Sequence, residues 1–304
     1  MQESKLLTDI LLSNFDLNKY PYKLTFAITY MCNFKCKHCN IWKKKPSNEL
    51  SLDEIELFAK NYPHFKWFNL TGGEPFLRKD VVEIIQTLKE NSTTPLLFNT
   101  TTNGFNPDFI YNKVEEILSL GIPMTVVVVS LDGYKELHDY IRGVKNSFDN
   151  AIETFKLLKQ LSTENKKFKT FLGYTITPLN IGKFKRTFIE VKKTINGISL
   201  NDFHFNIYHS SNHYYGNFGV FRKEEIMSYR KKLMEELTFI NSIKNHTMFS
   251  PVGFLEKAYV KLCINFVKNG RTPLPCKAVQ TSLFINPKGD VFPCTIFNVR
   301  VGNL

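Results

Sequence analysis

Six strand-length apolar runs alternate with helix-like segments between residues 23 and 209, and this alternation constrains the fold more than any other feature. The runs are Lys23–Tyr30, Lys66–Leu70, Pro95–Thr101, Ile122–Ser130, Phe168–Thr177 and Asp202–Tyr208. Most are nearly continuously apolar, as parallel strands buried on both faces are. Helices are expected from Ser51 onward and over about 79–91, 107–120, 147–164 and 180–195. The order predicts an α/β fold, a six-stranded partial (β/α)6 barrel, with an open doubly wound sheet as the alternative.

Two further helices and a hairpin are expected beyond this region. The helical segments run over 223–245 and about 251–269. Ser282–Asn286 and Asp290–Cys294 then flank a Pro-Lys-Gly turn, which is typical of a β-hairpin.

Polar motifs follow each of the six predicted strands, at the carboxyl ends where the active sites of βα barrels collect. The motifs are Cys32-x3-Cys36-x2-Cys39, Thr71-Gly72-Gly73-Glu74-Pro75, Thr102-Asn103-Gly104, Ser130-Leu131-Asp132-Gly133, Thr177 with Asn180, and His209 with Ser211. Six strand ends that present polar groups to one rim predict a single functional site there.

Cys32, Cys36 and Cys39 form a tight triplet, and no signal peptide precedes them, so a disulfide framework is not favoured. Three close thiolates can bind three irons of an Fe–S cubane and leave the fourth iron open for a ligand. The alternative is a structural zinc site with His38 as the fourth ligand. Adjacent His38 and Cys39 suit one tetrahedral centre poorly.

The stretch Cys32–Cys39 (CNFKCKHC), followed by Gly72-Gly73-Glu74-Pro75, resembles the radical S-adenosylmethionine (SAM) superfamily over at least residues 23–210. The resemblance implies a 4Fe–4S cluster on the three cysteines, with SAM chelating the open iron. It implies that the segment Gly72–Pro75 approaches the methionyl amino group of SAM. One electron would then cleave SAM to methionine and a 5′-deoxyadenosyl radical, which abstracts hydrogen.

Ser130, Asp132 and Arg142 resemble positions that contact the ribose or carboxylate of SAM in this family. An arginine can bind a carboxylate through two parallel N–H···O hydrogen bonds. For Ser130 and Asp132 the alternative is an N-cap of the helix after the fourth strand. Asn180 is expected to cap the fifth helix, with a family role near the adenosine as the alternative.

Other polar residues of the rim have ordinary explanations. Thr102 and Asn103 are expected to form a turn. Residues 204–215 carry several histidines, tyrosines, serines and asparagines. They line a substrate cavity or form an ordinary loop with surface histidines, and alternation places His204, Asn206 and Tyr208 on one face.

Cys276, followed by twelve residues, Gly289, four residues and Cys294, resembles the opening of a SPASM or twitch extension. In those families such a hairpin supplies two ligands of an auxiliary Fe–S cluster, so the resemblance implies one on Cys276 and Cys294. Because the further cysteines of such extensions do not follow, a truncated chain or a shortened hairpin without a cluster is favoured, and a site that includes Cys263 is the third alternative. Cys263 lies in an apolar helical stretch, where a packing role is expected.

The formal net charge is +12, and the basic residues are scattered along the chain. A solvated basic surface is favoured over nucleic-acid binding, and the charge is compatible with an acidic peptide or an acidic ferredoxin or flavodoxin electron donor. The longest apolar run, Met124–Val129, is too short to span a bilayer. We therefore expect a cytoplasmic protein without membrane contact.

The resemblance implies an enzyme that reductively cleaves SAM and abstracts hydrogen from a peptide or protein, as a maturase does, or from a small molecule. The alternatives are an RNA-modifying radical SAM enzyme and a non-catalytic Fe–S or zinc module. The expected organisation is an N-terminal extension (1–22), a radical SAM core barrel (23–215), a helical connector (216–270) and a partial SPASM-like segment (271–304).

Overall fold

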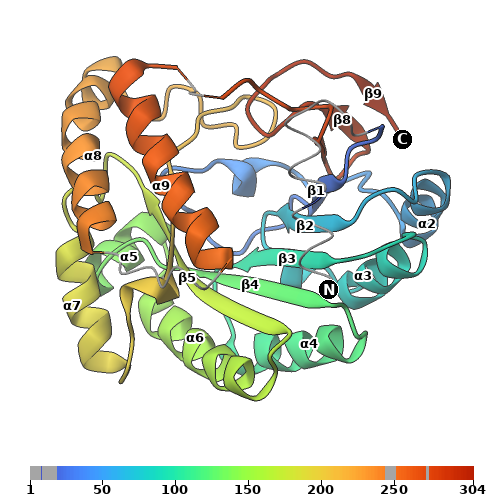
Figure 1. Ribbon diagram of the computed structural model, residues 1–304, viewed down its shortest axis with the longest axis horizontal. Helices are drawn as coiled ribbons and strands as arrows, with labels where there is room; N and C mark the ends of the chain where they lie inside the picture. Colours follow the sequence, from blue (N-terminus) through green and yellow to red (C-terminus); the bar gives the residue numbers. More distant parts are fainter. Residues whose placement is uncertain (1–7, 9–18, 244–250, 272–273) are drawn as a thin grey trace.

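The computed structural model describes residue 8 and residues 19–243, 251–271 and 274–304. Six parallel strands follow one another across the sheet in chain order (Figure 1). They are β1 (Lys23–Thr29), β2 (Trp67–Gly72), β3 (Leu97–Thr102), β4 (Met124–Ser130), β5 (Phe168–Ile176) and β6 (Phe203–Ile207). The predicted partial (β/α)6 barrel is confirmed. Its sheet is not closed, because β6 is an edge strand.

Helices connect the strands and pack on the outer face of the sheet (Figure 1). They are α2 (Leu52–Asn61), α3 (Val81–Glu90), α4 (Pro107–Ser119), α5 (Lys135–Arg142), α6 (Ser147–Glu164) and α7 (Phe184–Thr194). A capping box of Ser51 and Glu54 starts α2, as its sequence predicts. The short helix α5, between β4 and α6, is not among the predicted helices.

The strands divide their side chains between a helix-covered face and a more open inner face. On β2, Phe68 and Leu70 are buried in the main core, whereas Asn69 between them is half-buried. Successive strand residues point to opposite faces, so Asn69 lies on the inner face. There its Oδ1 accepts a hydrogen bond from Asn99 Nδ2 at 2.6 Å. The inner face thus carries polar groups below the rim at which the motifs collect.

Three short strands extend the sheet beyond β1: β7 (Ser282–Ile285), β8 (Asp290–Phe292) and β9 (Gly302–Asn303). The antiparallel pair β7–β8 is the predicted hairpin. The sequence does not predict that β7 also pairs in parallel with β1. A second core cluster packs the hairpin against residues on either side of the cysteine loop. Its buried members are Ala27, Tyr30, Ile41, Tyr214, Phe284 and Phe292.

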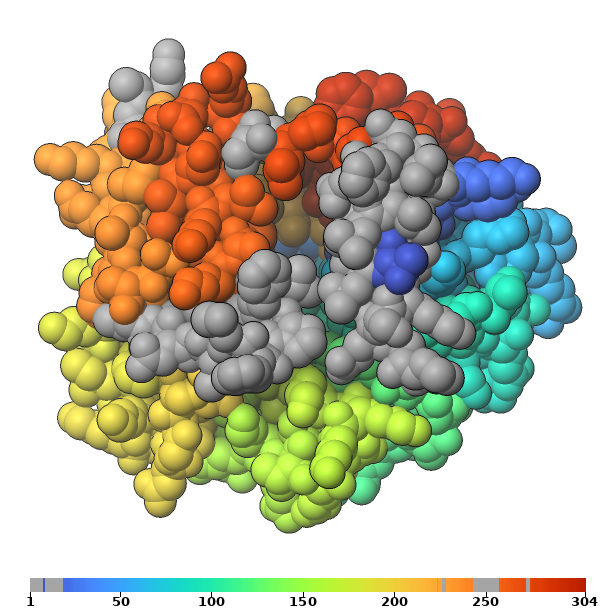
Figure 2. Space-filling model, viewed as in Figure 1, coloured from blue at the N-terminus to red at the C-terminus, as the bar shows by residue number. Residues whose placement is uncertain are grey.

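Two long helices, α8 (Lys223–Ile243) and α9 (Pro251–Asn269), pack against each other (orange in Figure 2). The last two residues of the predicted helix 223–245 lie outside the described residues. Residues 1–7 and 9–18 of the expected N-terminal extension also lie outside them. No helix in the described part of the chain is long and apolar enough to cross a membrane.

Candidate functional site

The cysteine triplet forms a short loop directly after β1. Exposed and buried residues alternate along it, with Cys36 buried between the exposed Lys35 and Lys37. The Cys39 N–H donates to the Cys36 carbonyl at 3.2 Å. Cys36 raises the pKa of Cys32 and of Cys39 by charge repulsion, and Cys32 also raises that of Cys39, an effect of neighbouring groups. The structure therefore brings the three predicted cysteines together.

Two segments distant in sequence hold this loop. At the end of α5, the Arg142 carbonyl accepts a hydrogen bond from the Lys35 N–H at 3.1 Å. After β6, Asn217 Nδ2 donates to the His38 carbonyl at 2.9 Å. Asn217 is fully buried. The sequence does not predict its role, because no local pattern marks an asparagine that supports a loop so far away in the chain.

Thiols are the usual protein ligands of iron–sulfur clusters, but burial keeps these three in the neutral form. Burial raises the pKa of Cys32 to about 11 and that of Cys39 to about 12, and it also raises the pKa of Cys36. Because only the thiolate binds a metal, these groups need a cation beside them to ionise. In the described ranges no three His, Cys, Asp or Glu side chains are placed to share one metal ion. A cubane does not require this, since each cysteine binds a different iron.

The Gly-Gly-Glu-Pro motif ends β2 and packs directly on the cysteine loop. The Gly73 N–H donates to the Thr29 carbonyl and the Glu74 N–H to the Met31 carbonyl, each at 2.8 Å. A Cβ on Gly73 would lie 2.1 Å from the Met31 carbonyl oxygen and 2.9 Å from Cβ of Cys32. The contact between the ends of β1 and β2 therefore requires a glycine here.

We expect Gly73→Ala to destabilise the protein by about 2–3 kcal/mol, because the methyl group overlaps backbone atoms that cannot rotate away. The matched control is Gly302→Ala, whose Cβ would lie 3.9 Å from the Val291 side chain, an ordinary contact. Thermal unfolding of the two variants and the parent protein measures the difference. Equal melting temperatures for Gly73→Ala and the parent would show that the two strand ends are not packed this way.

Glu74 is buried next to Pro75, which begins a short 3-10 turn. Its Oε2 accepts the Asn103 N–H at 2.6 Å. Burial raises the pKa of Glu74 to about 7, although its hydrogen bonds lower it. Thr102 and Asn103 form the predicted turn, in which Thr102 Oγ1 accepts the Gly104 N–H at 3.1 Å. The sequence does not reveal that the same turn binds Glu74.

Asp132 and Arg142 form a buried ion pair beside the cysteine loop, with 2.7 Å between Oδ2 and Nη2. Nη1 of Arg142 also lies 3.8 Å from the Cys36 sulfur. Burial opposes the guanidinium charge, but Asp132 and Cys36 raise the pKa of Arg142. The capping alternative is wrong for Asp132, because Tyr134 is the N-cap residue of α5. Asp132 Oδ1 instead accepts the Thr175 N–H at 3.0 Å.

Asn180 joins the ends of two neighbouring strands. Its Nδ2 donates to the Asp132 carbonyl at 2.8 Å, and its Oδ1 accepts the Thr177 N–H at 2.7 Å. The prediction that Asn180 caps the fifth helix is wrong, because α7 begins only at Phe184. Ser130 is the buried last residue of β4 and does not cap α5 either.

His138 on α5 is buried, and its Nδ1 accepts the Asp132 N–H at 3.0 Å, which requires the neutral imidazole. Burial lowers the pKa of His138 to about 3, and burial likewise lowers that of His38 to about 4. Below about pH 6.5 the unfolded chain binds protons that the folded protein excludes. Stability is therefore present above that pH and is lost as the pH falls.

From pH 7 to pH 5, the protein without its cofactors should lose about 2 kcal/mol of unfolding free energy through His138 alone. Urea unfolding at the two pH values measures this loss. The variant His138→Gln should lose less stability over the same interval. A pH dependence identical to that of the parent would contradict the assignment.

Residues of the polar-aromatic stretch after β6 contact different parts of the structure. Tyr214 is buried, and its hydroxyl lies 2.9 Å from Thr71 Oγ1. The His213 ring stacks on Phe292 with 4.3 Å between ring centroids, and its Nε2 lies 3.1 Å from the Cys294 carbonyl oxygen. These residues join the cysteine side of the barrel to the C-terminal hairpin.

The remaining cysteines differ in their surroundings. Cys276 is exposed, and the Cys294 sulfur accepts N–H groups of Ile296 and Phe297 at 3.4 and 3.3 Å. Cys263 lies on α9 and packs against the main core, which confirms the packing role expected for it.

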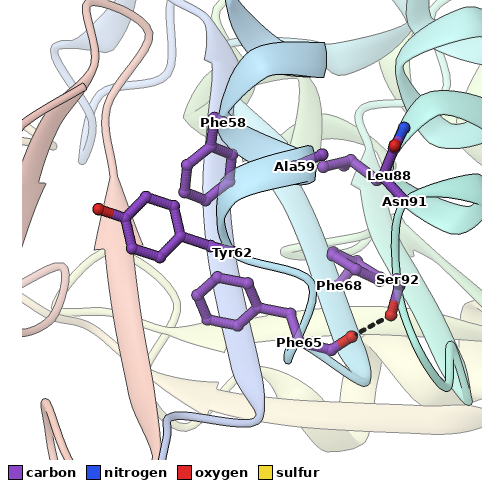
Figure 3. A pocket seen from close by; sticks show the side chains of 8 residues that line it. All are labelled: Phe58, Ala59, Tyr62, Phe65, Phe68, Leu88, Asn91 and Ser92. Atoms are coloured by element: carbon purple, nitrogen blue, oxygen red, sulfur yellow. Dashed lines mark hydrogen bonds between the residues drawn. The ribbon is translucent and has the colours of Figure 1, made fainter.

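A small apolar pocket lies between α2 and α3, at the start of β2 rather than at the cysteine end of the sheet (Figure 3). It is lined by Phe58, Ala59, Tyr62, Phe65, Phe68, Leu88, Asn91 and Ser92. We interpret it as a gap in helix packing.

The sequence of the chain is similar to known proteins over part of its length. The profile of the radical SAM superfamily matches residues 26–189. GTP 3′,8-cyclase of Pasteurella multocida is 28% identical over 187 residues, which cover 57% of this chain and 54% of that protein. Fe-coproporphyrin III synthase of Methanosarcina barkeri is 30% identical over 185 residues, 59% of this chain and 43% of that protein. The chain thus matches about half the length of these relatives.

Solved structures share the fold. Native anSMEcpe with bound AdoMet superimposes with a TM-score of 0.58 and 17% identity, over 93% of this chain and 78% of that chain. SuiB of Streptococcus suis bound to S-adenosylmethionine gives a TM-score of 0.55 and 16% identity, over 97% of this chain and 65% of that chain.

Proposed function

This chain belongs to the radical SAM superfamily, whose profile matches more than half of it, and we propose that Cys32, Cys36 and Cys39 hold its 4Fe–4S cluster. In such enzymes the reduced cluster cleaves SAM to a 5′-deoxyadenosyl radical that abstracts hydrogen from a substrate. The observation that carries the assignment is the packing of Gly73 on Cys32. It unites the cysteine loop and the Gly-Gly-Glu-Pro motif in one rim.

We propose that the segment Gly72–Pro75 receives the methionyl end of SAM and that Ser130 faces its ribose. For Asp132 and Arg142 the contacts favour a supporting role over direct SAM binding. Arg142 is already paired with Asp132 and directed at the Cys36 sulfur. The pair would hold the cysteine loop in place and supply positive charge beside one of its thiolates.

For the substrate we propose a peptide or protein, modified as by a maturase. The support is the β7–β8 hairpin, which lies between Cys276 and Cys294 in the chain and resembles the SPASM opening. The backbone N–H groups of Ile296 and Phe297 hold the Cys294 sulfur in place after the hairpin. In this proposal residues 23–215 form the radical SAM core, 216–270 a connector, and the hairpin holds an auxiliary cluster.

A nucleotide is the second candidate substrate, because GTP 3′,8-cyclase of Pasteurella multocida is similar to this chain over 187 residues. The test incubates the reconstituted enzyme with SAM, a reductant and either GTP or peptides encoded by short reading frames beside its gene. A changed peptide mass with extra 5′-deoxyadenosine supports the maturase proposal. Consumption of GTP with extra 5′-deoxyadenosine, and no changed peptide, would overturn it in favour of a nucleotide substrate.

A further inference from the structure

We propose that the exposed side of the cysteine loop is the docking site of an acidic one-electron donor protein. The surface, here termed the loop surface, consists of Lys35, Lys37 and Lys43 with the rings of Trp42 and Tyr140. This inference rests on the proposed function, because only an enzyme whose cofactor is reduced by one electron needs such a donor.

The loop surface combines two groups of side chains that come from three elements. Lys35 and Lys37 belong to the cysteine loop, Trp42 and Lys43 to the short 3-10 helix Ile41–Lys43, and Tyr140 to α5. The Lys37 ammonium lies 4.5 Å from the centre of the Tyr140 ring. Those of Lys35 and Lys43 lie 6.0 and 5.2 Å from the Trp42 ring. Lys35 and Lys37, both exposed and separated in the chain only by Cys36, bring these two groups together on one side of the loop.

The positive charge of the loop surface is not neutralised by its neighbours. In the part of the chain that the structure describes, none of Lys35, Lys37 and Lys43 forms an ion pair. By contrast, Lys60, Lys113, Lys135, Lys156 and Lys159 each pair with a carboxylate. The carboxylate of Asp139, on α5, is directed at Asn146, Ser147 and Phe148 at the start of α6, and it forms no ion pair with these three lysines. The three lysines thus present positive charge that no ion pair engages, which suits an acidic partner.

The patch is fixed in position relative to the cysteines. The N–H groups of Lys35 and Lys37 donate to the carbonyls of Arg142 and Ile141 at 3.1 and 2.8 Å. Cys36 lies between these two lysines in the chain and is buried directly behind them. A donor docked on the lysines would therefore be separated from the cysteine ligands by little more than the loop itself. Tyr and Trp side chains beside the charges are typical of interface cores.

An acidic electron carrier is favoured over nucleic acid for two reasons. The basic patch is small, three lysines on one loop and its neighbouring turn, whereas nucleic-acid sites usually present a longer basic stripe. The patch also lies at the cysteine loop, where an electron must enter. Electrostatic pairing at such a surface chiefly accelerates association and makes it dependent on salt.

The test uses the reconstituted full-length enzyme and its variant Lys35→Glu/Lys37→Glu/Lys43→Glu. The control variant Lys166→Glu/Lys167→Glu/Lys185→Glu makes the same charge change, at exposed lysines before β5 and on α7. Each protein receives electrons from reduced flavodoxin or from reduced methyl viologen, a small cation that needs no docking surface. The rate of cluster reduction and the yield of 5′-deoxyadenosine are measured at low and high salt. Carbodiimide cross-linking to flavodoxin, mapped by mass spectrometry, locates the contact.

The proposal predicts that charge reversal on the loop surface slows flavodoxin-supported reduction at low salt by at least about 10-fold, while the methyl viologen rate does not fall, because the reversed charge attracts this small cation. The control variant should behave as the parent, and the cross-links should map to the loop surface. Equal flavodoxin rates in all three proteins, or RNA protecting these lysines where flavodoxin does not, would overturn it. If the parent makes no 5′-deoxyadenosine even with methyl viologen, the proposed function itself fails, which is a different result.

Discussion

Replacing Cys36 by Ala is expected to abolish SAM cleavage, with a loss of activity of at least about 100-fold. Losing a ligand should cost more than losing a residue that only hydrogen-bonds a ligand. Cys36 is the most buried of the three loop cysteines, and Arg142 is directed at its sulfur. The loop offers no fourth thiol that could replace it. Iron content and 5′-deoxyadenosine yield after anaerobic reconstitution measure the effect.

Cys263→Ala is the matched control for this experiment. Cys263 packs against the core on α9, so its replacement should leave iron binding and SAM cleavage almost intact. Retention of SAM cleavage in Cys36→Ala would contradict the assignment of the cluster ligands. Equal losses in both variants would show that the effect comes from folding rather than from the cluster.

The second large effect is expected for Arg142→Met, which should lower the unfolding free energy by about 3–5 kcal/mol. Methionine fills most of the same volume but leaves Asp132 as a buried carboxylate without its partner. The exposed pair Arg222–Glu225 provides the control, and Arg222→Met should cost less than about 1 kcal/mol. Urea unfolding midpoints measure both changes.

A double variant distinguishes the ion pair from simple packing. Asp132→Leu together with Arg142→Met removes both charges, so it should recover part of the stability that Arg142→Met alone loses. If Arg142→Met unfolds at the same urea concentration as the parent, the pair does not carry the stability assigned to it. If the double variant is as unstable as the sum of two single variants, the loss reflects packing.

The main barrel could be predicted from sequence because its strands carry long apolar runs with clear boundaries. β5 and α6 begin and end within about one residue of their predicted limits. The helix α5 could not be predicted, because its buried face contains His138 and Arg142 and so lacks an apolar stripe. The parallel pairing of β7 with β1 could not be predicted either, since a hairpin motif specifies only its own antiparallel partner.

The site was predictable in its motifs but not in its contacts. The spacing of the cysteines and the Gly-Gly-Glu-Pro motif locate the rim, because each follows a predicted strand. By contrast, the Arg142–Asp132 pair depends on how α5 folds back against β4. Asn180 joins two strand ends instead of capping a helix. Such partners are set by tertiary structure, and single-sequence patterns do not encode them.

The most direct test is anaerobic reconstitution with iron and sulfide, followed by dithionite and SAM, with iron counted and 5′-deoxyadenosine detected by mass spectrometry. The account predicts 5′-deoxyadenosine and about four irons per chain, or about eight if the hairpin holds a second cluster. Uptake of zinc in place of iron, with no 5′-deoxyadenosine formed, would contradict it.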